Sequence, residues 1–309
     1  MLRYILKRLL LLIPVFLGVS VTVFTIMQLA PGDPVLNMIG ENPGPMAAEQ
    51  YELLRKKLGL DQPIYIQYIK WMERFFHGDL GRSIITHRLV WDEIRVRYPR
   101  TIRLAIASII IAVSIAIPAG VISATRQYSI FDNLIMGGAV FGISIPSFWM
   151  GIMFIYIFSF RLRLTPMSGI GGIEYLILPA ISLGMRSVGY LARLTRSSML
   201  EVLRQDYIRT ARSKGLSERI IIYVHALQNA LIPVITAIGG RFGTLLGGSL
   251  ITETVFSYPG LGMLAIKAIR ETDYPTVQGS LMITTFTYVL VYLIVDIIYA
   301  YIDPRVEYE

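Results

Sequence analysis

The stretch LAIASIIIAVSIAIPAGVIS, residues 104–123, runs for 20 positions without a charged side chain. A bilayer core about 30 Å thick takes roughly 20 apolar helical residues to cross, because lipid cannot satisfy unpaired backbone groups. The stretch therefore predicts a membrane-spanning helix. Five more stretches of similar character flank it, at residues 9–30, 134–160, 176–194, 230–256 and 281–302. The fold class predicted from them is an all-α integral membrane protein with six transmembrane helices.

The composition agrees with a membrane protein. Hydrophobic residues make up 54% of the 309 residues and charged residues only 16%, whereas soluble domains carry about 25% charged residues. The absence of cysteine excludes disulfides, thiolate metal sites and thiol nucleophiles. A net charge of +8 marks the cytoplasmic side of a membrane protein more often than a nucleic-acid partner, so we expect lipid and no nucleic acid.

Lys and Arg residues in the short loops orient the spans. With the N-terminus inside, the inner segments carry eleven basic residues and the short outer loops carry four. Both termini are therefore predicted to be cytoplasmic. The first apolar run is too long for the core of a signal peptide, and Pro31 after Ala30 disfavours cleavage. We expect residues 1–30 to remain as a cytoplasmic N-terminus and first span.

Residues 31–103 form the one sizeable insert, expected to be extracytoplasmic and mainly helical. Residues 50–58 predict a short helix ended by Gly59, and Asp61 is a candidate cap for a second helix. Aromatic side chains follow at helical spacing: Tyr65, Tyr68, Trp71 and Phe75. They suit a helix lying on the membrane or on a neighbouring domain, either as a small packed lid or as a contact surface for substrate.

The inner loop, residues 195–229, carries the most specific pattern. Residues 197–213 predict a helical continuation of the fourth span, which Gly215 then interrupts. Ser217 is a candidate N-cap for a short helix over 218–226, with Glu218 at the positive end of its dipole. The basic residues here are explained by orientation alone, but the apolar ones suit docking in a groove of a partner.

Two parts of this loop resemble a known motif. YIRTARSKGLSE (207–218) and HALQNALIP (225–233) are similar to the cytoplasmic EAA loop of ABC-importer permeases, in the version of the dipeptide, oligopeptide and nickel branch. The general motif has Glu-Ala-Ala where this chain has Arg209, Thr210 and Ala211, so only Ala211 and Gly215 match it. These departures disfavour the sugar-type permeases and fit the peptide-type branch.

Other stretches resemble the first permease subunit of that branch, in order along nearly the whole chain. They are RYILKR (3–8), APGDP (30–34), LGLDQP (58–63), GDLG (78–81), SIPSFW (144–149), VFSYPGLG (255–262) and DPR (303–305).

The resemblance implies a type I ABC importer permease fold that supplies half of a pore. It also implies three kinds of partner: a homologous second permease subunit, cytoplasmic ABC ATPase subunits that bind ATP and Mg, and an extracytoplasmic substrate-binding protein. The implied transmembrane domain covers residues 104–302, and 303–309 form a cytoplasmic tail. The implied ATPase-coupling residues are Arg209, Thr210, Ala211, Lys214, Gly215, Leu216, Ser217 and Glu218.

The residues themselves agree that energy comes from elsewhere. No lysine follows a glycine, so the chain encodes no P-loop for nucleotide phosphates. His77, His87 and His225 are scattered and predict no metal site. Since no catalytic motif occurs either, we expect a transport subunit that is not an enzyme and holds no cofactor.

Charged residues inside the spans are candidate functional groups, because burying charge in a bilayer is costly. Arg186 and Arg241 lie deepest and would either line the pore or form interhelical ion pairs. Asp296, near the inner end of the last span, suits an ion pair or a cap. Glycines in the fifth span (239, 240, 243, 247 and 248) allow close packing, within the subunit or at the seam with a second pore subunit.

The predicted function is uptake of di- or oligopeptides across a bacterial or archaeal cytoplasmic membrane by alternating access. Nickel, glutathione or an oligosaccharide remain open as cargo within the same importer class. An ion-gradient-driven transporter and a membrane scaffold remain as alternatives of other classes.

Overall fold

The computed structural model describes residues 2–29, 35, 47–57 and 59–302. All the elements named within these ranges are helices, and β pairing there is limited to one isolated bridge between Arg82 and Leu89. The predicted tail 303–309 and most of residues 30–46, at the start of the predicted insert, lie outside the described residues.

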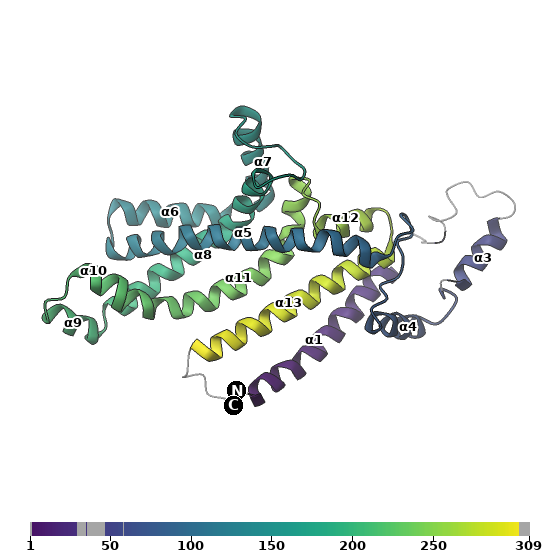
Figure 1. The fold of residues 1–309 in the computed structure, drawn as a ribbon, viewed down its shortest axis with the longest axis horizontal. Coiled ribbons are helices and arrows are strands. Elements are labelled where there is room, and N and C mark those ends of the chain that lie inside the picture. The colour runs from purple at the N-terminus through teal and green to yellow at the C-terminus, as the bar shows by residue number, and fades with distance from the viewer. Residues whose placement is uncertain (1, 30–34, 36–46, 58, 303–309) are drawn as a thin grey trace. The chain divides into compact units, whose positions relative to one another are not determined.

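Figure 1 shows the helices in chain order. They are α1 (Leu2–Leu29), α3 (Ala47–Lys57), α4 (Ile64–Phe76), α5 (Val90–Thr125), α6 (Ile130–Ser144), α7 (Ser147–Phe154), the π-helix η1 (Ile155–Arg161), α8 (Glu174–Leu203), α9 (Asp206–Ser213), α10 (Glu218–Ile220), the π-helix η2 (Ile221–Ala226), α11 (Leu227–Val255), α12 (Leu261–Arg270) and α13 (Tyr274–Ile302).

The chain divides into two compact units. The first comprises Met1–Lys7, Ile102–Tyr258 and Leu290–Glu309, and the second comprises Arg8–Thr101 and Pro259–Val289. Helices α1, α5 and α13 each contribute residues to both units.

Five described helices are long and apolar enough to cross a membrane. The pair α6 and α7–η1 is a sixth candidate, bent by 105° at its break. Residues 134–160, which we predicted as a single span, are therefore two helical segments joined at a sharp bend. Ile145 precedes Pro146 and adopts extended backbone angles (φ −79°, ψ 131°), as expected where the proline ring disfavours a helical predecessor. Counted as one broken span, the pair brings the total to the predicted six.

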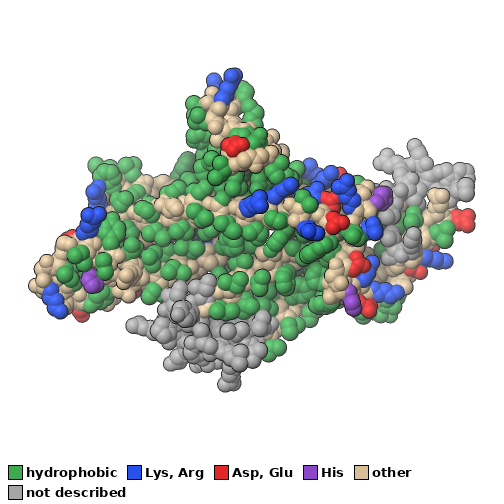
Figure 2. Space-filling model, viewed as in Figure 1, with side chains coloured by type: hydrophobic (Ala, Val, Ile, Leu, Met, Phe, Trp, Pro, Cys, Tyr) green, Lys and Arg blue, Asp and Glu red, His purple; other side chains and the backbone are tan. Residues whose placement is uncertain are grey.

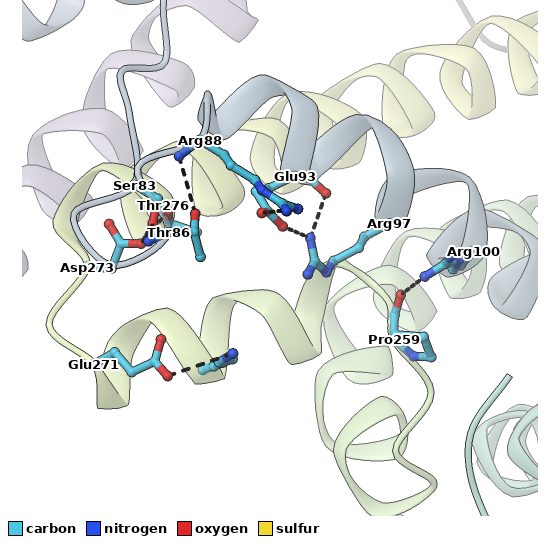
Figure 3. A network of polar contacts seen from close by, with 11 residues as sticks. Ser83, Thr86, Arg88, Glu93, Arg97, Arg100, Pro259, Glu271, Asp273 and Thr276 are labelled. Atoms are coloured by element: carbon cyan, nitrogen blue, oxygen red, sulfur yellow. Dashed lines mark hydrogen bonds and ion pairs between the residues drawn. The ribbon is translucent and has the colours of Figure 1, made fainter.

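Helix α5 begins earlier than the second predicted span. Residues 90–103, which we assigned to the insert, are its first turns. Asp92 and Glu93 lie in the first turn, where carboxylates are favourable to the helix dipole. Glu93 is nearly buried and pairs with Arg97 one turn later (Figure 3).

In the second unit, a buried carboxylate joins a loop to the start of α13. Asp273 accepts hydrogen bonds from the Ser83 hydroxyl (2.5 Å), the Ile84 amide (3.0 Å) and the Thr276 hydroxyl (2.7 Å). Figure 3 shows Ser83, Asp273 and Thr276 converging at this point. The hydrogen bond between Ile84 and Asp273 joins two residues that are 189 positions apart in the sequence.

The aromatic helix of the insert packs on α1. Tyr68 and Trp71 of α4 lie with ring centroids 5.4 and 5.7 Å from that of Phe24, and the Tyr68 hydroxyl lies 2.7 Å from Ser20 Oγ. This part of the aromatic face thus lies against a helix of its own unit, whereas the sequence suggested the membrane surface or a neighbouring domain. The cap at Asp61 is wrong, because Pro63 occupies the N-cap position of α4.

In the first unit, glycines let α5 and α6 approach α8 closely. A Cβ on Gly184 would lie 2.7 Å from the Ser108 carbonyl oxygen of α5, and one on Gly189 would collide with the Ala139 carbonyl of α6. A Cβ on Gly120 of α5 would lie 2.8 Å from the Ala192 carbonyl oxygen. Such contacts bury backbone against backbone, as in other membrane helices with small residues at their interfaces.

Figure 2 shows mainly hydrophobic side chains along the middle of α5 and on α6, and charged side chains at the start of α5 on the right and where α9 and α10 lie on the left. An apolar surface of this extent is expected of helices that face lipid.

Candidate functional site

We call residues 204–226 the knuckle. Helix α8 ends at Leu203, and Gln205 is extended (φ −69°, ψ 151°) before α9 begins at Asp206. The prediction that residues 197–213 form one continuation of the fourth span is therefore wrong. The predicted separate helix over 218–226 is also wrong, because α10, η2 and α11 follow one another from Glu218 to Val255 without a break.

Gly215 ends α9 as the sequence predicts. Its φ of +79° lies in the left-handed region, which glycine adopts without steric cost. The Gly215 amide donates to the Arg212 carbonyl (2.9 Å) and the Leu216 amide to the Ala211 carbonyl (3.3 Å). This pair of bonds is the Schellman arrangement, which satisfies the carbonyls left over at the helix end.

The inner face of the knuckle is anchored in the first unit. Ile208, Ile221 and Ala226 are fully buried and share a cluster with Met199 of α8 and Val121 of α5. Burying the side chains of Ile208 and Ile221 stabilises the folded state by about 3–6 kcal/mol. The knuckle is thus fixed to the ends of α5 and α8, beside which α9 and α10 lie in Figure 1.

The outer face of the knuckle carries seven of the eight predicted coupling residues, and only Ala211 is buried. The exposed seven are Arg209, Thr210, Lys214, Gly215, Leu216, Ser217 and Glu218. The structure therefore presents them together on one protruding segment, bounded by the Gly215 turn.

An ion pair bridges the Gly215 turn. The Arg212 Nε donates to Glu218 Oε1 (2.7 Å) and its NH2 donates to Oε2 (3.2 Å). Hydrogen bonding to this carboxylate raises the pKa of Arg212 above its ordinary value. Ser217 stands at the N-cap position, but its side chain makes no capping hydrogen bond. The Ser217 side-chain cap is therefore wrong, and Glu218 closes the turn instead.

A second ion pair was missed from the sequence. Arg196 of α8 forms an ion pair with Asp132 of α6. Its Nε donates to Oδ1 and its NH2 donates to Oδ2, and both distances are 2.7 Å. Asp132 also accepts from the Ser123 hydroxyl and from the Tyr128 amide (2.9 Å). The Ser129 hydroxyl in turn accepts from the Asp132 amide, so the Ser-x-x-Asp spacing was a readable helix start.

The candidate intramembrane residues lie on two helices of the first unit and on α13. Arg186 is exposed on α8, and Arg241 of α11 places its guanidinium carbon 3.9 Å from the ring centroid of Tyr190 on α8. Among the described residues, neither arginine forms an ion pair with a carboxylate. Asp296 is partly exposed near the end of α13.

In the described part of the chain, no group of three or more His, Asp or Glu side chains lies close enough together to hold a metal ion. The three histidines therefore give no candidate metal centre there.

Comparison with known families assigns almost the whole chain. Residues 116–308 match the family described as binding-protein-dependent transport system inner membrane component, and residues 1–105 match the N-terminal region of such membrane components. The chain belongs to this family. Family membership makes it a multi-pass inner-membrane transport subunit, and the transport systems of this family include a binding protein and an ATPase.

Two curated relatives cover the chain from end to end. The dipeptide transport system permease protein DppB of Escherichia coli K12 is 41% identical, with 100% of both chains covered. A putative peptide transport system permease protein of Brucella abortus is 44% identical over 99% of both chains.

Solved structures share the fold. The chain superposes on a chain of the inward-facing MetNI methionine ABC transporter with a TM-score of 0.58, 20% identity and coverage of 68% of this chain and 96% of that one. An amino acid ABC transporter with histidines gives a TM-score of 0.53 at 14% identity, with 68% and 94% covered. The predicted type I ABC importer permease fold of this family member is confirmed.

Proposed function

We propose that this chain is the pore-forming permease subunit of an ATP-driven importer of di- and oligopeptides. The observation that carries the proposal is its full-length likeness to dipeptide and di/tripeptide permeases, at 40–41% identity. Peptide is thereby favoured over nickel, glutathione or an oligosaccharide as cargo. The energy comes from separate ATPase subunits that bind ATP and Mg, because the sequence holds no P-loop of its own.

The knuckle is the site at which the ATPase docks. Its inner face is buried against α5 and α8, while its outer face presents a rigid turn with exposed charged residues and with Leu216 and Ile220. An exposed apolar pair within a charged rim suits a groove in a partner. This assignment puts the knuckle and both termini in the cytoplasm, and puts the insert, residues 31–89 once the start of α5 is removed, outside, where a substrate-binding protein delivers cargo.

A homologous second permease subunit completes the pore. Gly239 of α11 is covered by Val295 within this chain, but no atom lies within 4 Å of a Cβ at Gly240 or Gly247. These two uncovered glycines on one helix suit close contact with a helix of another subunit.

The test is uptake of a radiolabelled dipeptide into vesicles that contain the whole complex, with the binding protein supplied. We expect accumulation that needs ATP and survives a protonophore. Accumulation by this chain alone, or its collapse with the protonophore, would establish a gradient-driven transporter instead. Retention of Ni²⁺, glutathione or a sugar by the purified binding protein, without peptide, would reassign the cargo.

A further inference from the structure

The exposed side of α8 is polar along its middle and inner parts. Between residues 178 and 203, the exposed side chains are Arg186, Tyr190, Arg193, Ser197 and Glu201. They recur every three or four residues and so share one face of the helix. We call these five residues the α8 stripe. The rest of this part of the helix is buried or half-buried.

The neighbouring helices expose the opposite kind of surface. The large exposed side chains of α6 include Leu134, Val140 and Phe141, and those of α5 include Ile106 and Ile110. These apolar faces suit lipid. A row of guanidinium groups does not, because a charge at membrane depth is costly unless it meets water or a partner.

Arg241 adds a third positive charge to the stripe, beside those of Arg186 and Arg193. It reaches from α11 to lie over the ring of Tyr190, and Arg186 stands one turn away on the same face of α8. Among the described residues, neither guanidinium is neutralised by a carboxylate, in contrast to Arg196, which is held by Asp132.

We propose that the α8 stripe is the water-facing wall of the translocation path, and that Arg186 and Arg241 attract the C-terminal carboxylate of the peptide that passes them. This inference rests on the proposed function for the identity of the cargo. The carboxylate is the negative charge that an unmodified peptide always carries, and a guanidinium binds it in a planar, two-bonded geometry.

The chain offers an internal depth control for testing the wall. Gly189 of α8 contacts the backbone of Ala139 on α6, so the next residues, Tyr190 and Val140, lie at nearly the same level of the bilayer. Val140 is 52% exposed and Tyr190 39%. Because the chain has no cysteine, Tyr190→Cys and Val140→Cys each introduce its single thiol.

The experiment uses the assembled complex in permeabilised membranes, with labelling read on this chain. Two membrane-impermeant methanethiosulfonates serve as probes, one with a sulfonate and one with a trimethylammonium group. We expect both to modify Tyr190→Cys and neither to modify Val140→Cys. Equal protection of both thiols would overturn the wall assignment.

The ratio of the two labelling rates tests the charge. Taking the ratio cancels the thiolate fraction, which the arginines also change. Relative to a free thiol in solution, we expect the ratio to favour the sulfonate by about 25-fold, because a unit charge roughly 4 Å away in water attracts the sulfonate about fivefold and repels the trimethylammonium group about fivefold. Adding Arg186→Gln and Arg241→Gln should reduce the preference to what Arg193 alone provides, and Lys at both positions should keep it. A ratio unchanged by the Gln substitutions would overturn the attraction.

Transport in the same membranes tests the carboxylate. With binding protein and peptide both saturating, the double Gln variant should lower maximal uptake severalfold and the double Lys variant should retain most of it. Equal losses in both variants would contradict a role of charge. If the unmodified complex moves no peptide while the labelling pattern holds, the proposed function fails and the wall assignment stands.

Discussion

Arg196 and Asp132 join α8 to the first turn of α6 through two parallel hydrogen bonds, each 2.7 Å long. The carboxylate is buried, whereas the arginine side chain remains 23% exposed. Ser123 at the end of α5 donates to the same carboxylate, so the Asp132 side chain joins three helices.

Removing one partner of this pair should destabilise the protein strongly. Arg196→Ala leaves a buried carboxylate without its counter-charge, and we expect a loss of about 3–5 kcal/mol. Lys267→Ala is the matched control, because Lys267 is exposed and its 3.8 Å pair with Glu271 is loose, and such pairs contribute about 0–1 kcal/mol. Thermal unfolding of the purified complex in detergent measures both. Similar melting temperatures for the two variants would contradict the role assigned to Asp132.

The Arg212–Glu218 pair allows shape to be separated from charge. Arg212→Glu or Glu218→Arg alone places like charges across the Gly215 turn, and we expect reduced co-purification with the ATPase. The double exchange restores the pair with reversed polarity and should recover most of the binding. Recovery would show that the pair holds the turn, whereas a double variant as poor as the single ones would show that the ATPase reads the charges directly.

Gly215 should tolerate only residues that accept a positive φ. A Cβ at this position would meet no atom within 4 Å, so the cost of a substitution is conformational. Gly215→Val should cost more than the roughly 1–2 kcal/mol of an ordinary left-handed residue, and Gly215→Asn should cost less. Peptide-stimulated ATP hydrolysis and peptide uptake are measured together. In the Val variant we expect less peptide taken up per ATP hydrolysed, and in the Asn variant we expect this ratio to stay unchanged. Identical coupling in both would remove the turn from the mechanism.

Gly184 and Gly137 should respond oppositely to alanine. A methyl group at Gly184 would lie 2.7 Å from the Ser108 carbonyl oxygen, and the same group at Gly137 meets nothing within 4 Å. We expect Gly184→Ala to destabilise by about 1–3 kcal/mol and Gly137→Ala to be neutral or to stabilise by up to about 1 kcal/mol. Unfolding in detergent compares them directly.

Asp273 should be needed to hold the loop of residues 82–89. Asp273→Ala leaves the Ile84 amide and the Ser83 and Thr276 hydroxyls without their acceptor, at about 1–3 kcal/mol for each group that stays buried. Limited proteolysis should then cut this loop faster. Glu271→Ala, two residues away on the surface and in a loose 3.8 Å pair with Lys267, should leave the cutting rate unchanged.

Much of the fold was accessible from the sequence because lipid imposes a simple rule of length and apolarity. Spans such as residues 104–123 follow from it directly. The break after Ser144 was readable too, since a residue before proline avoids helical angles, but the apolar run on both sides concealed it. The start of α5 at Val90 could not be predicted, because the first turns of this helix are charged and resemble a loop in the sequence.

The candidate site was predicted in its local part only. Gly215 and the exposed coupling residues follow from neighbouring positions in the chain. The Arg196–Asp132 pair and the approach of Arg241 to Tyr190 join residues 64 and 51 positions apart, and local patterns carry no information about such partners. The choice of Arg186 and Arg241 as pore candidates rested on their depth alone, and the face they occupy became visible only with the helices packed.

The uninterrupted course of α10, η2 and α11 has a mechanical consequence. Between Glu218 and Val255 the backbone is helical throughout, so a rotation imposed on the knuckle would be passed along one continuous helix. Pro233 interrupts the backbone hydrogen bonds of this helix, because proline has no amide proton to donate. The orientation of Arg241, which follows Pro233 on the same helix, is then coupled to the orientation of the knuckle.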